Sequence, residues 1–86
     1  MDMRRLVGRN VRRIRQEKGL TQERFAELSG FSQQYLSDIE RGRRNPTVVT
    51  LFELSQALGT AHMALVEPDD KALSETAEKP PRGKRG

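Results

Sequence analysis

The stretch QERFAELSGFSQQYLSDIER, residues 22–41, holds two short amphipathic segments on either side of a corner. Gly30 lies at the corner, where the backbone needs a positive φ that glycine adopts without strain. Ala26 is small enough for two helices to cross closely, and Leu36 and Ile39 supply apolar side chains that pack the second segment down. The pattern therefore predicts two short helices that meet at an angle.

The two predicted helices, about 22–29 and 33–41, have the length and the corner of a helix-turn-helix motif. Phe25 and Leu28 supply the apolar side of the first helix. The second helix leaves polar side chains outside its apolar stripe. We expect the following to point outward: Gln33, Gln34, Ser37, Asp38 and Arg41.

The same order of cap, helix and glycine repeats along the chain. A glycine ends each helical segment, and a Ser or Thr that can accept a backbone N–H follows it. The glycines are Gly19, Gly30, Gly42 and Gly59, and the expected N-caps are Thr21, Ser32, Thr47 and Thr60. Helices are thus expected at 3–18, 22–29, 33–41, 48–58 and 61–66.

Apolar residues recur at helical spacing in the flanking segments too, as Val7, Val11 and Ile14 show. No segment alternates as a strand would. A second stripe consists of Val48, Leu51, Leu54, Ser55 and Leu58. The sequence predicts an all-α fold, a compact bundle of about five short helices.

Hydrophobic residues are concentrated in residues 1–66, and the last twenty residues are charged and contain most of the prolines. Such a composition cannot bury enough apolar surface to offset the entropy lost on ordering. We therefore expect one folded domain at 1–66 and a disordered tail at 67–86. The basic end of that tail, Lys79 to Arg85, is a candidate for nonspecific contact with an acidic partner.

Composition excludes several classes of function. The chain has no cysteine and a single histidine, His62, which we expect to face solvent. No pattern typical of a catalytic site, a metal site or a cofactor-binding loop is present, so we expect neither an enzyme nor a small-molecule ligand. No apolar run is long enough to span a membrane, and we expect a cytoplasmic protein. The formal net charge is +4, with the basic excess in residues 1–46, which favours an acidic partner.

Residues 6–66 resemble the Cro and phage-repressor-like (XRE-type) helix-turn-helix family, whose fold is the lambda-repressor-like DNA-binding domain. The resemblance depends on an ordered set of short pieces at family spacing. They are Arg15, Gly19-Leu20-Thr21-Gln22, Phe25-Ala26, Gly30-Phe31-Ser32, Ile39-Glu40-Arg41-Gly42, Asn45-Pro46-Thr47 and Ala57-Leu58-Gly59.

The resemblance implies roles for the polar positions around the motif. The position of Gln22 bonds a DNA phosphate in relatives, and that of Gln33 reads a base. A glutamine amide carries a donor and an acceptor side by side, which matches the N6/N7 edge of adenine. Gln34 would read the adjoining base pair, and Ser37 would reach a base or a phosphate. Asp38 would accept from cytosine or pair with a neighbouring arginine.

Two further groups of residues follow from the resemblance. In the family, the loop after the recognition helix lies along the DNA backbone, and relatives carry an internal ion pair at the positions of Arg15 and Glu40. Arg9, Arg12 and Arg13 are expected on a solvated face of the first helix, with one of them a candidate for a backbone contact. The phosphate-binding loop residues would be Arg41, Arg43, Arg44 and Asn45.

A single motif of this size makes few contacts with DNA, and half-sites about 34 Å apart are read by two-fold dimers. Val49 and Phe52 are the candidates for a homodimer surface, with Met63 and Val66 near it; completion of the monomer core is the alternative for each. The expected function is a sequence-specific, double-stranded-DNA-binding repressor or autoregulator on a pseudo-palindromic operator. The alternatives are an antitoxin that binds both operator and toxin, and a protein-binding adaptor that has lost DNA binding.

Overall fold

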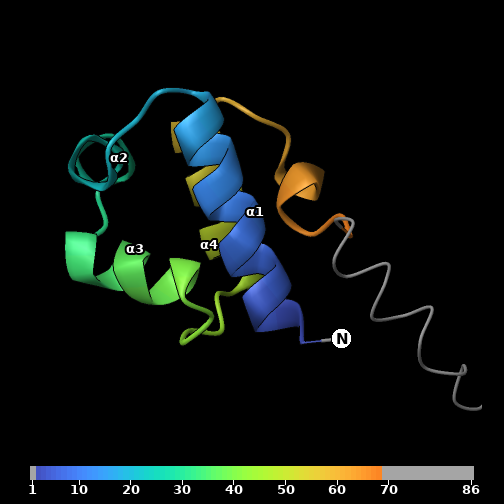
Figure 1. The fold of residues 1–86 in the computed structure, drawn as a ribbon. Coiled ribbons are helices and arrows are strands. Elements are labelled where there is room, and N and C mark those ends of the chain that lie inside the picture. The colour runs from blue at the N-terminus through green and yellow to red at the C-terminus, as the bar shows by residue number, and fades with distance from the viewer. Residues whose placement is uncertain (1, 69–86) are drawn as a thin grey trace, which may run out of the picture.

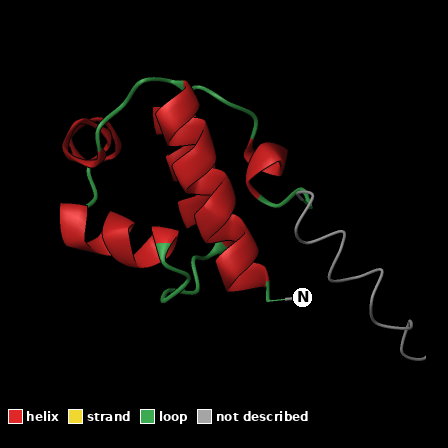
Figure 2. Ribbon diagram, viewed as in Figure 1, coloured by secondary structure: helices red, strands yellow, loops and turns green. Residues whose placement is uncertain are grey.

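Four α-helices and one 3-10 turn follow one another in residues 2–68, the part of the chain that this computed structural model describes (Figures 1 and 2). No strand occurs within these residues. Residues 69–86, most of the predicted tail, lie outside the described residues. The elements are α1 (Met3–Glu17), α2 (Gln22–Ser29), α3 (Gln33–Glu40), α4 (Val48–Leu58) and the 3-10 turn η1 (His62–Leu65).

Side-chain caps set the starts of the α-helices. Thr21, Ser32 and Thr47 each accept a backbone N–H three residues later, at 3.0 Å, as predicted. Gly30, at the corner between α2 and α3, has φ +82°, which confirms the left-handed corner. Asp2, which sequence analysis did not single out, caps α1 by accepting from the Arg4 N–H at 3.1 Å.

The prediction that Thr60 caps a helix was wrong. The η1 turn begins after Ala61 and has no side-chain cap. The Thr60 N–H donates instead to the Ser55 carbonyl oxygen at 3.0 Å and so completes the C-terminal turn of α4. The N-cap position of η1 is Ala61, one residue later, whose side chain has no acceptor.

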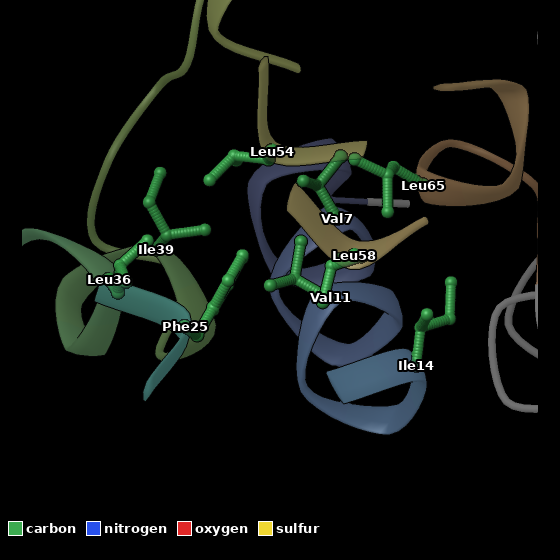
Figure 3. Close-up of a cluster of buried hydrophobic side chains, with 9 residues drawn as sticks. All are labelled: Val7, Val11, Ile14, Phe25, Leu36, Ile39, Leu54, Leu58 and Leu65. Atoms are coloured by element: carbon green, nitrogen blue, oxygen red, sulfur yellow. The ribbon is translucent and has the colours of Figure 1, made fainter. Parts of the chain in front are cut away.

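The core lies between α1 and the other elements (Figure 3). Figure 1 shows α2 and α3 on one side of α1, η1 on the other, and α4 behind it. The structure confirms most of the predicted core. The following predicted core residues are all buried: Val7, Val11, Ile14, Phe25, Leu36, Ile39, Leu54, Ser55 and Leu58. Leu65 of η1 joins them and is fully buried.

Two residues assigned to the core are exposed. Leu28 is 45% exposed, because it lies at an open groove between α2 and α4 beside Glu53 and Gln56. Val48 is 81% exposed and lines another groove together with Phe52, one turn later on α4. Both follow the helical period of their neighbours, yet no other element of residues 2–68 covers them.

Close backbone contact between α1 and α3 sets the position of the second motif helix. A Cβ at Gly8 would overlap the carbonyl oxygen of Ile39 and lie 2.7 Å from that of Glu40. Only a residue without a side chain allows the last turn of α3 to lie so near to α1. Gly8 therefore fixes where α3 is held.

Candidate nucleic-acid interface

The outer side of α3 presents polar side chains, and its inner side is buried. Leu36 and Ile39 are fully or almost fully buried and hold the helix against the core. Gln33 and Gln34 are exposed at its N-terminal end, and Ser37 is half-buried one turn later. A helix held from one side presents the other side as a rigid surface, which is the geometry needed to enter a DNA groove.

Asp38 connects the recognition helix to the loop that follows it. Its Oδ1 accepts a hydrogen bond from Gln34 Nε2 at 3.0 Å, and its Oδ2 lies 3.5 Å from Arg44 Nε. The Arg44 guanidinium also lies over the Tyr35 ring, 5.2 Å from the ring centre. Two roles were expected for Asp38, a hydrogen bond from cytosine or a pair with a neighbouring arginine. The structure shows the pair with an arginine.

Gln22, Arg15 and Glu40 form one network at the C-terminal end of α3. Arg15 Nε and Nη2 donate to the two oxygens of the Glu40 carboxylate, at 2.6 and 3.1 Å. Arg15 Nη1 donates to the Leu20 carbonyl oxygen at 2.8 Å. Gln22 Nε2 donates to Glu40 Oε1 at 3.1 Å. The network ties α1, the start of α2 and the end of α3 together, with side-chain exposures of only 12% for Arg15 and 5% for Glu40.

A polar hollow brings several predicted residues to one place. It has a volume of about 230 Å³ and lies where α1, α2 and α3 meet. Three of its lining side chains are arginines and one is a glutamate, so the hollow carries a net positive charge. Its lining consists of Arg12, Arg15, Gln22, Ser37, Glu40 and Arg41.

The loop between α3 and α4 carries the remaining predicted cations. The Arg43 N–H donates to the Asp38 carbonyl oxygen at 2.9 Å, which anchors the loop to α3. Of the α1 arginines, Arg12 shares the hollow, whereas Arg13 turns away and donates to Glu17 and Asn10. The predicted phosphate-binding residues of the loop are all exposed: Arg41, Arg43, Arg44 and Asn45.

An apolar groove lies apart from this polar surface, between α4 and η1. Val49 is 65% exposed and Phe52 47% exposed, so neither completes the core. Val66 lines the groove, whereas Met63 is exposed outside it. His62 is exposed, as expected, and it also lines the groove, with its ring centre 6.1 Å from that of Phe52.

A comparison with known protein families identifies the family to which this helical domain belongs. The helix-turn-helix family model HTH_3 matches residues 11–64, which include all of α2, α3 and α4. The chain belongs to this XRE (Cro/C1-type) helix-turn-helix family. As a member of the XRE family it is a DNA-binding transcriptional regulator and not an enzyme.

Three XRE-type proteins illustrate the likeness. The HTH-type transcriptional regulator y4dJ of Sinorhizobium fredii is 68% identical over 71 residues, which cover 83% of this chain and 92% of y4dJ. The immunity repressor of Bacillus phage phi105 is 42% identical over 84% of this chain, which spans only 50% of that repressor. The restriction-modification controller protein C.Esp1396I, solved as a tetramer with its natural 35 base-pair operator, superposes with a TM-score of 0.71 at 28% identity. The match covers 90% of this chain and 97% of the controller.

Sequence reasoning missed Asn10, which is buried inside the XRE-type domain. Its Nδ2 donates to the carbonyl oxygens of Leu65 and Glu67, both at 2.9 Å. The only signal in the sequence was a polar residue adjacent to the apolar stripe of α1, and its partners lie more than fifty residues away.

The described part of the chain contains no cluster of three or more His, Cys, Asp or Glu side chains that could hold a metal ion. None of the helices within residues 2–68 combines the length and the apolar character needed to cross a membrane.

Proposed function

We propose that this regulator binds a specific double-stranded DNA operator as a homodimer, and that it acts there as a repressor or autoregulator. The observation that carries the proposal is the exposed pair Gln33 and Gln34 at the start of a helix held rigidly from behind, beside a loop rich in arginine. This combination supplies both kinds of contact that a specific complex needs: base edges and phosphates.

Gln33, Gln34 and Ser37 are the proposed base-reading residues. A glutamine amide can bond adenine at N6 and N7 together, and such a pair is worth about 1–3 kcal/mol of discrimination. Gln33 makes no side-chain hydrogen bond that competes with this contact among those that the structure shows in residues 2–68. Ser37 borders the hollow with Gln22 and would reach a base or a phosphate.

Gln22 and the loop residues are the proposed phosphate contacts. The bond to Glu40 uses one of the two hydrogens on Gln22 Nε2, so the second hydrogen stays available for a phosphate oxygen. The guanidinium groups add salt-dependent affinity and set the register. The proposed phosphate-binding set is Gln22, Arg41, Arg43, Arg44 and Asn45.

Val49 and Phe52 are proposed to form the dimer surface with the rest of the groove between α4 and η1. Residues 47–70 contain no Lys or Arg, so this segment suits an interface that faces away from DNA. Dimeric reading of two half-sites would produce the selectivity that one short helix lacks. The operator complex of the C.Esp1396I tetramer supports assembly on DNA, and the phi105 immunity repressor supports the direction of regulation.

Selection of bound sites from random duplex DNA tests the proposal. The wild-type protein should select a pseudo-palindromic site, and Gln33→Ala should relax the preference at one or two base pairs in each half-site. Gln56→Ala is the matched control, because Gln56 is an exposed glutamine on α4, and it should leave the selected site unchanged. Failure of the wild-type protein to select any site would reject the proposal, and uniform weakening by Gln33→Ala would make Gln33 a backbone contact.

A further inference from the structure

We propose that Asp38 determines which base Gln34 reads, by holding the Gln34 amide in one orientation. The inference deepens the proposed function and depends on it. It starts from the bond between Gln34 Nε2 and Asp38 Oδ1, at 3.0 Å. Asp38 itself is a positioning residue here, because its carboxylate is half-buried on α3 while Gln34 is exposed at the end of the helix.

The bond distinguishes the two ends of the Gln34 amide. A carboxylate only accepts hydrogen bonds, so it attracts the amide nitrogen and repels the amide oxygen. The two residues are one turn apart on the same face of α3, where side chains at this spacing meet. The amide nitrogen is therefore held toward Asp38, and a rotation that exchanges nitrogen and oxygen would place two acceptors against each other.

Asp38 is itself restrained from the opposite side. Arg44 Nε lies 3.5 Å from its second oxygen, and the side chain of Asp38 is only 17% exposed. The Arg44 guanidinium is held in turn above the Tyr35 ring. An acceptor that is fixed in this way restricts its partner more strongly than a freely rotating surface side chain would.

The fixed amide presents one acceptor and one remaining N–H. In the major groove adenine offers a donor at N6 beside an acceptor at N7, which this pair complements. Guanine offers two acceptors, O6 and N7, and needs two donors. With one hydrogen engaged by Asp38, Gln34 has only one donor left. The structure thus favours adenine over guanine at the base pair that Gln34 reads.

Competitive binding to paired duplexes tests the inference. Site selection with Gln34→Ala first identifies the base pair that Gln34 reads, and two duplexes that differ only by adenine or guanine there are then compared. The wild-type protein should prefer adenine by about tenfold, within the range of a bidentate contact. Asp38→Ala should reduce the ratio of adenine-duplex to guanine-duplex affinity by about fivefold or more. The amide can then rotate and offer both hydrogens to guanine.

Three further variants separate positioning from other effects. Asp38→Asn keeps only one oxygen, for which Gln34 and Arg44 compete, so it should lower the preference but less than Asp38→Ala does. Arg44→Ala removes a proposed phosphate contact and one restraint on Asp38, so it should weaken binding to both duplexes and lower the ratio less than Asp38→Ala does. In the Gln34→Ala background, Asp38→Ala should have no further effect on the ratio. Urea unfolding of each variant checks that the fold is intact.

The outcomes are distinct for the two proposals. If the wild-type protein selects no site, the proposed function fails. If it selects a site but the base pair read by Gln34 carries guanine, the inference alone is overturned. The same follows if Asp38→Ala keeps the wild-type ratio, if Asp38→Asn loses as much as Asp38→Ala, or if Asp38→Ala still changes the ratio without Gln34.

Discussion

Arg15, in the last turn of α1, donates two hydrogen bonds to Glu40, the last residue of α3, at 2.6 and 3.1 Å. The Glu40 carboxylate also accepts from Gln22, so one buried acid holds three elements in register. The ion pair therefore fixes where α3 lies relative to α1 and the start of α2.

Arg15→Met should lower the free energy of unfolding by about 3–5 kcal/mol, because it leaves the Glu40 charge buried without its partner. Urea denaturation followed by circular dichroism measures the change. Replacing both partners, with Arg15→Met and Glu40→Leu, should recover part of the loss, since no unpaired charge then remains. A loss below about 1 kcal/mol for Arg15→Met would instead show that the pair is solvated in solution.

Asn10→Ala should destabilise the fold by about 2 kcal/mol or more, because it leaves the carbonyl oxygens of Leu65 and Glu67 without the donors that now reach them. Hydrogen exchange should show faster opening of η1 than of α3. Arg13→Ala removes only the exposed pair with Glu17 and the donor to Asn10 Oδ1, and it should cost less than about 1 kcal/mol. Equal losses for the two variants would argue that Asn10 does not anchor η1.

Gly8→Ala should destabilise the protein by about 1–3 kcal/mol, although alanine favours helix formation. The new Cβ would collide with backbone carbonyl oxygens of α3, which cannot rotate away as a side chain can. Thermal unfolding and operator affinity should fall together, since α3 itself must move. Gln16→Ala, at an exposed position of α1, is the control and should change stability little. A more stable Gly8→Ala variant would show that α1 and α3 do not touch at this point.

Phe52→Glu should weaken self-association at least about tenfold, because it places a charge in the apolar groove proposed as the dimer surface. Sedimentation velocity over a range of concentrations measures the effect. Met63→Lys adds a charge at a side chain that is exposed outside the groove, and it should leave the association unchanged. If Met63→Lys separates the protomers and Phe52→Glu does not, the dimer forms elsewhere.

Arg43→Ala should reduce the slope of log affinity against log salt concentration by about 0.9 for each phosphate that the variant no longer neutralises, with no change in the preferred site. Fluorescence anisotropy with the selected duplex at several salt concentrations measures the slope. Arg13→Ala removes an equal charge from the side of α1 that carries Asn10, and the slope should then stay as in the wild-type protein. An altered base preference after Arg43→Ala would make Arg43 a reader of sequence.

Much of the domain was predictable because its signals are local. Thr21, Ser32 and Gly30 act through hydrogen bonds and backbone angles within a few residues, so the bounds of α2 and α3 follow from short stretches of sequence. The exposure of Gln33 and Gln34 follows in the same way from the burial of Leu36 and Ile39 on the other side of the helix. Thr60 shows the limit, since it closes α4 and the N-cap position of η1 is Ala61, one residue later.

The sequence by itself therefore determined the helices, the apolar stripes and the polar side of α3, since each depends on neighbours within about two helical turns. Only the tertiary structure decided that Leu28 and Val48 stay uncovered, that Asn10 holds η1, and that α4 and η1 leave an apolar groove between them. These features depend on which elements meet in space. Helical period alone shows which side of a helix is apolar, but not where the neighbouring element ends.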